Sequence, residues 1–154
     1  TPRGQYLGDP GTYYSFALLT HQYGYGSDIE YQQGNFYVGF AGYDFGFYTL
    51  LGNVPIDEVT TSTPAVQYLA SYVPPTTDAT IRAAQQLAGT GFYVGSYYYR
   101  DCVGILLNVT YVLRSICYDT SDVLVALRVV QVLSDASVII IWKQLATFPV
   151  PHAR

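Results

Sequence analysis

Strand-length runs of apolar residues dominate the second half of the chain and predict a sheet there. Four runs rich in Val, Ile, Leu and Tyr follow one another at 92–100, 109–118, 123–133 and 138–147. The segments 119–122 and 134–137 separate the last three runs and consist of the Asp, Ser, Thr and Ala residues of short turns. Strands joined by short turns pair with their sequence neighbours. We therefore expect an antiparallel meander over 91–148.

The last two of these runs are apolar on both faces. Val123, Val125 and Leu127 share one face of the expected strand, and Leu124 and Ala126 share the other. A strand with two apolar faces is not freely solvated on either side. We expect these strands to lie centrally in the sheet or to contact a partner.

A helical spacing replaces the strand pattern at 63–89, where we expect two helices. Thr63 precedes Pro64, which is the usual order of an N-cap and a first helical residue, and apolar residues then recur every three or four positions up to the Pro pair at 74–75. A second helix is expected to start at Thr77 or the next residue, Asp78, because these side chains can accept the free amide hydrogens of a first turn.

The second helix is expected to end at Gly89 as its C-cap, since glycine adopts the backbone conformation that terminates a helix. Upstream of both helices, residues 1–57 are rich in Gly and Tyr and predict short strands and long loops. Strands, then helices, then an antiparallel sheet predict an α+β fold. With 154 residues, the chain fits one domain, 1–154.

Charge and composition exclude several classes of function. Only 12% of the residues are charged, and seven basic residues stand against eleven acidic ones. Such a chain has no broad phosphate-binding surface, so we do not expect nucleic acid as a partner. No run approaches the roughly 18 uncharged apolar residues of a membrane span. The His and Cys residues lack the spacing of a metal site, so no metal is expected.

The cysteines and a glycosylation signal favour secretion. Cys102 and Cys117 permit one disulfide, and Asn108 begins an Asn-Val-Thr acceptor sequence. Lysine is scarce and tyrosine abundant, with 17 Tyr in the chain. We expect a secreted or extracellular protein whose first residue was exposed by processing, with delivery into host cells as a further expectation.

Basic residues recur at nearly even intervals along the expected strands. They are Arg100, Arg114, Arg128 and Lys143, and a hairpin folded at 135–136 would place Arg128 directly opposite Lys143. One interpretation is an anion site built on the sheet from Arg114, Arg128 and Lys143. The alternative is a set of strands that each expose one charge, balanced by nearby Asp residues.

Several short stretches, read in order, resemble one known family. They are Pro-Arg-Gly-Gln at 2–5, a His-bearing segment at 19–22, Val-Thr-Thr-Ser at 59–62, Ala-Gly-Thr-Gly-Phe-Tyr-Val-Gly at 88–95, and a weaker group at 107–110, 125–127 and 141–142. In this order they resemble the A-subunit mono-ADP-ribosyltransferase toxins, the family of cholera toxin, heat-labile enterotoxin and pertussis toxin. The resemblance implies an ADP-ribosyltransferase-like fold, a toxin-like or virulence role and, in an active member, NAD as the cofactor.

The resemblance also implies which residues would form a site. His21, Thr60 and Ser62 match the family's His and its Ser-Thr-Ser segment. The transferase reaction needs a carboxylate to stabilise an oxocarbenium-like centre, but the matching position holds Val123. Asp122 is adjacent and would point to the opposite face of a strand unless a bulge shifts the register.

The family's first strand carries an Arg that holds the NAD phosphates, and this strand is missing before residue 2 or belongs to a second processed chain. We therefore expect a catalytically inactive effector, with no cofactor, that binds a host or partner protein through its Tyr-rich loops. Three alternatives stay open. Thr60 and Ser62 can serve the helix start and His21 can be a packing residue. An acid such as Glu30 or Glu58 can make an active NAD-dependent transferase or glycohydrolase. The apolar sheet can also belong to a self-assembling extracellular subunit.

Overall fold

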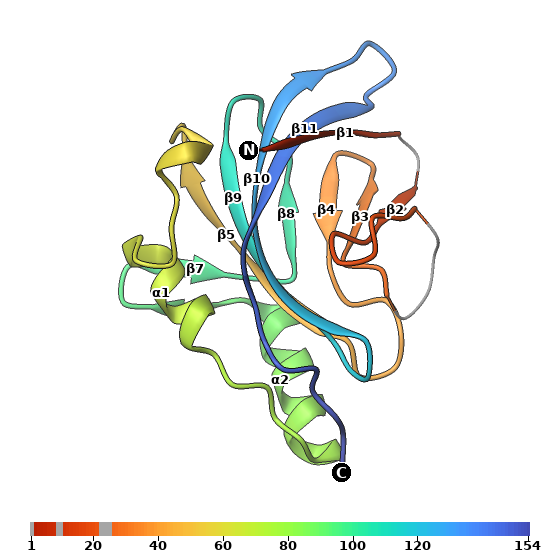
Figure 1. The fold of residues 1–154 in the computed structure, drawn as a ribbon, viewed down its shortest axis with the longest axis vertical. Helices are drawn as coiled ribbons and strands as arrows, with labels where there is room; N and C mark the ends of the chain where they lie inside the picture. Colours follow the sequence, from red (N-terminus) through yellow and green to blue (C-terminus); the bar gives the residue numbers. More distant parts are fainter. Residues whose placement is uncertain (1, 9–10, 22–25) are drawn as a thin grey trace.

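The described residues form three antiparallel sheets and two α-helices (Figure 1). The computed structural model describes residues 2–8, 11–21 and 26–154. The largest sheet has the strand order β1-β11-β10-β9-β5, a second has the order β2-β3-β4-β8, and β6 and β7 form a two-stranded sheet. The strands are β1 (Arg3–Leu7), β2 (Thr12–Tyr14), β3 (Ile29–Gln32), β4 (Asn35–Tyr37), β5 (Phe45–Gly52), β6 (Phe92–Val94), β7 (Tyr97–Tyr99), β8 (Cys102–Gly104), β9 (Thr110–Cys117), β10 (Ser121–Val132) and β11 (Val138–Thr147). Antiparallel sheets with two helices confirm the expected α+β class.

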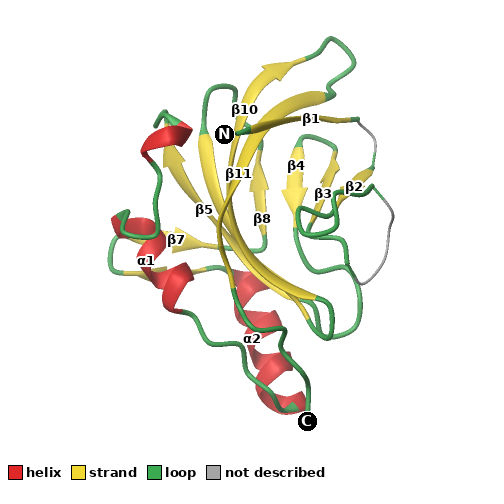
Figure 2. Ribbon diagram, in the orientation of Figure 1, coloured by secondary structure: helices red, strands yellow, loops and turns green. Residues whose placement is uncertain are grey.

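The large sheet lies in the middle of the molecule and has a core on each face. Val125 and Leu127 of β10 pack in one core with Phe36 of the four-stranded sheet. Leu124 of β10 faces the other core, where it packs with residues of both helices such as Leu69. Figure 2 shows the four-stranded sheet on one side of the large sheet and the helices on the other. The expectation that the two-faced apolar strands lie centrally is confirmed.

The two helices begin where the sequence predicts, and the second ends slightly later. Helix α1 spans Pro64–Ser71, after the short 3-10 helix Ile56–Glu58, and α2 spans Asp78–Thr90. Thr77 forms a capping box with Thr80, since the Thr77 hydroxyl accepts from the Thr80 amide. The C-cap of α2 is Gly91, whose φ of 86° is left-handed, so the prediction of Gly89 was wrong.

The expected meander is present as β9, β10 and β11, but the run at 92–100 is not one strand. It is the hairpin of β6 and β7, turned at Gly95, whose φ is 61°. The N-terminal half supplies both outer strands of the large sheet, because β1 pairs with β11 and β5 pairs with β9. These long-range pairings join the two halves into one structure.

The register of the β10–β11 hairpin also differs from the prediction. Arg128 pairs with Ile141, and Lys143 pairs with Ala126. The hairpin closes with Val132 opposite Val138, a register in which Arg128 would already face Trp142 instead of Lys143. A β-bulge between Val129 and Gln131 shifts the pairing by one further residue, so the two cations are not directly opposite each other.

Gly46 of β5 lies close against the main chain of β9 and gives a test of this packing. A methyl group at Gly46 would overlap the main-chain carbonyl of Arg114 and come within 2.9 Å of Val38 Cγ2. We expect Gly46→Ala to lower the free energy of unfolding by about 3 kcal/mol, because backbone must move to make room. The matched control is Gly4→Ala in β1, where the added atom meets nothing within 4 Å. Urea unfolding of both variants checks this, and equal midpoints would contradict the close approach.

Candidate functional site

His21 is held by neighbours near the N-terminal strands. Its Nδ1 lies 3.1 Å from the Tyr13 carbonyl oxygen and its Nε2 lies 2.8 Å from Gln5 Nε2. The carbonyl can only accept, so Nδ1 carries the proton and Nε2 accepts from the Gln5 amide. The ring also contacts Tyr14 at 5.0 Å between centroids. His21, which follows β2, is therefore bonded through Nδ1 to Tyr13 of β2 and through Nε2 to Gln5 of β1.

Thr60 and Ser62 lie in an exposed turn before α1. The Thr60 hydroxyl accepts from the Ser62 amide at 3.2 Å, and the Thr63 hydroxyl accepts from the Thr60 amide at 3.0 Å. These bonds organise the chain just before the helix, as the helix-start alternative expects. Helix α1 packs on one face of the large sheet, whereas Tyr14, which contacts His21, packs in the core of the other face. The structure does not bring His21 together with Thr60.

Asp122 forms a buried ion pair with Arg114. The Arg114 guanidinium donates from Nε to Asp122 Oδ1 at 2.6 Å and from Nη2 to Oδ2 at 2.7 Å. Its Nη1 donates to the Leu69 and Tyr72 carbonyls at 2.6 and 2.9 Å, and the Phe148 ring covers it at 3.6 Å from Cζ. Burial raises the pKa of Asp122, and the guanidinium opposes that effect. The candidate acid is thus fully occupied by a structural partner.

The three cations of the predicted anion site are not available together. Arg114 is neutralised by Asp122 inside the protein. Arg128 donates to the Val54 carbonyl at 3.1 Å and to Asn53 Oδ1 at 2.7 Å, which fixes the loop after β5. For Arg114, the structure agrees better with the alternative, in which each strand charge is balanced by a nearby Asp residue.

The candidate acids of the active-enzyme alternative also lie apart. Glu58 is exposed at the end of the 3-10 helix, two residues before Thr60. Glu30 is half-buried in β3, in the four-stranded sheet on the other side of the large sheet. Only Glu58 is close in the chain to one of the predicted site residues.

The predicted disulfide between Cys102 and Cys117 is not present, and both thiols are free. Cys102 belongs to β8 of the four-stranded sheet and Cys117 to β9 of the large sheet. Cys117 lies in the core, where burial, with Asp28 and Asp44 close by, raises the pKa of its thiol. Its thiol therefore stays protonated and unreactive in the folded protein.

The glycosylation candidate Asn108 is exposed, in a turn where its φ is 63°. The acceptor sequence also needs Thr110, which is buried and donates from Oγ1 to the Val54 carbonyl at 2.5 Å. Glycosylation of Asn108 stays a prediction, and it would have to precede folding.

Two buried carboxylates that the sequence analysis missed stand beside Cys117. Asp28 accepts from the Ser115 hydroxyl at 2.6 Å and from the Phe16 amide at 2.8 Å. Asp44 accepts from the Tyr118 amide at 2.9 Å. Each directly precedes a strand, β3 or β5, a position that does not by itself predict burial. Asp28 joins β9 to the segment before β3, and Asp44 joins the residue after β9 to the segment before β5.

Asp44 makes stability depend on pH in a defined direction. Burial, more than the nearby Asp28 and Asp119, raises the pKa of Asp44 from 3.8 to about 7, although the Tyr118 amide opposes this. An acid with a raised pKa in the folded state stabilises it fully below its unfolded pKa. That stabilisation is lost as the pH rises through about 7.

We expect the free energy of unfolding of the wild type to fall between about pH 4 and pH 7 relative to Asp44→Asn. The difference corresponds to at most about 4 kcal/mol, because each pKa unit is worth about 1.36 kcal/mol. The amide introduced by this substitution would still accept from Tyr118 but could not ionise. Urea unfolding of both proteins across this pH range checks the prediction, and parallel profiles would contradict it.

A group of exposed aromatic side chains belongs to the hairpin of β6 and β7. Tyr93 is 69% exposed, and Val94, Tyr97 and Tyr98 are exposed beside it. Tyr93 and Tyr98 form a cross-strand pair with ring centroids 4.9 Å apart. We call β6, β7 and their turn the Tyr hairpin.

The other face of the Tyr hairpin anchors it to the protein. Tyr99 is buried and donates from its hydroxyl to the Ala65 carbonyl at 2.6 Å. The Phe92 ring contacts Phe47 at 5.2 Å between centroids. The main chain of Arg100 exchanges two hydrogen bonds with Tyr48 of β5. The exposed rings therefore stand on a fixed base.

Two hollows flank the Tyr hairpin. One, of about 400 Å³, lies between the hairpin and β5 and includes Leu50 and Tyr93. The other, of about 490 Å³, lies between the hairpin and α1 and includes Gln67 and Tyr68. Tyr97 lines both and separates them, and neither is lined by a charged residue.

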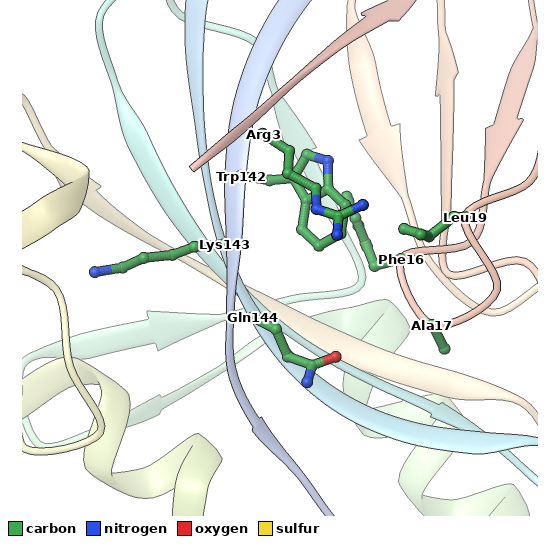
Figure 3. Close-up of a pocket in the computed structure, with 7 residues that line it drawn as sticks. All are labelled: Arg3, Phe16, Ala17, Leu19, Trp142, Lys143 and Gln144. Atoms are coloured by element: carbon green, nitrogen blue, oxygen red, sulfur yellow. The ribbon is translucent and has the colours of Figure 1, made fainter. Parts of the chain in front are cut away.

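A further cavity, of about 300 Å³, lies where β1 meets β11 and shares no lining residue with either hollow. Figure 3 shows the Arg3 side chain across the Trp142 ring and Lys143 directed away from both. Phe16 packs against Trp142 at 4.8 Å between ring centroids. This cavity was not among the predicted sites, although Arg3 lies in the Pro-Arg-Gly-Gln stretch.

Comparison of the chain with protein-family models, curated proteins and solved structures gives no significant match. Among the described residues, no group of three or more His, Cys, Asp or Glu is arranged to hold a metal ion. Neither helix in the described part of the chain has the length and apolar character needed to cross a membrane.

Proposed function

We propose that this is a secreted, toxin-like or effector protein that binds a partner protein through the Tyr hairpin and does not transfer ADP-ribose. The likeness to ADP-ribosyltransferase toxins is part of the proposal and is supported by the order of the matching motifs in the sequence. The observation that carries the binding function is the Tyr hairpin, with exposed rings on a fixed base and a hollow on each side.

Tyrosine suits a contact surface for a physical reason. Its ring covers a large area at a low cost in side-chain entropy, and its hydroxyl can bond to a partner or to water. Because Phe92, Tyr99 and Arg100 already fix the hairpin, binding would have to order little of it. A fixed surface retains more of its contact energy as affinity.

The lining of the two hollows favours an extended, uncharged segment of the partner. A charged side chain placed there would lose water and meet no opposite charge. Aromatic grooves with hydroxyl groups are typical sites for proline-containing segments, which are already extended before binding. Tyr97 lies between the two hollows, so an extended partner segment that crosses Tyr97 could place one side chain in each hollow. We therefore propose a proline-containing segment as the occupant.

The absence of transferase activity is supported by where the site residues lie. Asp122 is held by Arg114 on the helix side of the sheet, while Val123 packs in the other core. His21 and Thr60 lie on different sides of the large sheet, so no carboxylate in the described part of the chain converges with both. The chain then retains surface for binding and lacks an assembled acid for the chemistry.

The binding proposal predicts the effect of removing two exposed rings. We expect uncharged peptides about ten residues long, in which proline alternates with Ala, Val or Tyr, to bind the wild type. The double variant Tyr93→Ala, Tyr97→Ala should bind about 30-fold more weakly, since losing central aromatic contacts costs about 2 kcal/mol. Fluorescence anisotropy of labelled peptides measures this.

The matched control is Tyr6→Ala, which removes an exposed tyrosine from β1 of the large sheet and should leave peptide affinity unchanged. Equal loss in the control, or no peptide binding at all, would overturn the proposal. So would tighter binding of a neutral oligosaccharide such as cellohexaose in the same hollows. Dimerisation abolished by the double variant would instead identify a second copy as the occupant and favour a self-assembling subunit.

The proposed inactivity has its own test. We expect no nicotinamide release above that of heat-denatured protein when the folded chain is incubated with NAD and an arginine-rich acceptor. Nicotinamide release that is lost in Glu58→Gln but kept in Glu30→Gln would establish an active enzyme and refute this part of the proposal. Isothermal titration with NAD separates binding from turnover.

A further inference from the structure

The cavity beside Trp142 is lined by a cation without an ion pair and by a tryptophan with a buried, unbonded N–H, as far as the described residues go. Arg3 has no carboxylate within ion-pair distance among the described residues, and its Cζ lies 5.8 Å from the Trp142 ring centroid. Trp142 is 4% exposed, and its Nε1 is buried without a hydrogen-bond acceptor in the described part of the chain. A buried N–H without an acceptor costs free energy that a ligand oxygen could recover.

Uncharged and apolar groups complete the cavity. Phe16 and Leu19 supply apolar surface, and the Gln144 amide stands at the lower edge in Figure 3. No Asp or Glu lines it, and the Lys143 side chain points away. The local charge is therefore positive on a protein whose net charge is -4. At about 300 Å³ the cavity is at the small end of ligand sites.

We propose that this cavity binds a small organic carboxylate with an apolar body. The carboxylate pairs with the Arg3 guanidinium, whose planar fork of donors matches two carboxylate oxygens. Arg3 is exposed and lies over the ring, so its shift toward the ligand opens the indole N–H to the same group. The apolar body then lies against Phe16 and Leu19.

This site is independent of the Tyr hairpin. Trp142 and Phe16 belong to the core on the side of the four-stranded sheet, whereas Tyr99 of the hairpin belongs to the core on the helix side. Loss of peptide binding at the hairpin would leave the proposed carboxylate site unchanged, and the reverse also holds.

Trp142 is the sole tryptophan of the chain, so its fluorescence reports on this cavity alone. The probe is phenylacetate, and phenylacetamide is its uncharged counterpart of nearly the same shape. We expect phenylacetate to change the fluorescence in a saturable way and to shift the indole N–H resonance in an NMR spectrum. Phenylacetamide should bind at least about tenfold more weakly, because it lacks the charge that pairs with Arg3.

Variants assign the binding to named groups. Arg3→Gln should weaken phenylacetate binding by about 10- to 100-fold, and Arg3→Lys by less, because the lysine keeps the charge without the fork. Lys143→Gln is the comparison variant: Lys143 is among the lining residues, but its side chain points away in Figure 3, so its loss should weaken binding much less than Arg3→Gln. Trp142→Phe should also weaken phenylacetate binding, because the variant lacks the indole N–H. Its affinity is measured by calorimetry, since the variant has no tryptophan fluorescence.

Three results would overturn the proposal. They are equal binding of phenylacetate and phenylacetamide, unchanged affinity in Arg3→Gln, and no response of the tryptophan to either compound. Competition by inorganic phosphate at the affinity of phenylacetate would show a general anion site and would also refute the assigned ligand class. The control for folding is circular dichroism of Arg3→Gln and Arg3→Lys, whose spectra should equal that of the wild type.

Discussion

Strand β10 is covered on both faces, and this double burial constrains every polar group near it. A charge placed inside such a sheet is tolerated only when it is paired and its remaining hydrogen bonds are satisfied. Arg114 and Asp122 meet this condition through two bonds to each other and two bonds from Arg114 to the chain around α1. The ion pair thus ties the meander to the helix layer, and neither of its members is free for chemistry.

The same constraint places the candidate functions at the periphery. The interior of the sheet is filled by packing and by buried carboxylates that serve the fold, such as Asp28 and Asp44. The exposed aromatic rings of the Tyr hairpin and the unpartnered Trp142 N–H lie away from the centre of the large sheet, on the hairpin and beneath the edge strand β1. The Tyr hairpin projects beside the helices, and the Trp142 cavity lies where β1 meets β11, with the four-stranded sheet on that side. The two proposed binding surfaces are therefore separate and differ in chemistry. One is uncharged and aromatic, and the other contains a cation that has no ion pair within the described ranges of the chain.

Much of the fold could be predicted from local pattern, and most of the site could not. The meander, the two helices and their starts at Pro64 and Asp78 follow from apolar spacing and from residues that cap or turn the chain. The end of α2 was placed at Gly89 instead of Gly91 because two glycines two residues apart are equally good terminators by sequence. The hairpin within 92–100 was missed because its turn, Gly95 and Ser96, lies inside a run of aromatic residues.

The sequence by itself determined which segments are strands or helices, because hydrophobic period, capping and turn residues act over a few neighbouring positions. Only the tertiary structure decided which distant residues meet. Pairing of β1 with β11 and of β5 with β9 joins segments that lie far apart in the chain, and no local spacing encodes such contacts. This long-range pairing places Arg3 over Trp142. The β9–β10 hairpin alone makes Arg114 and Asp122 diagonal neighbours, but only the packing of α1 adds the Leu69 and Tyr72 carbonyls to Arg114. The separate sheets keep Cys102 from Cys117.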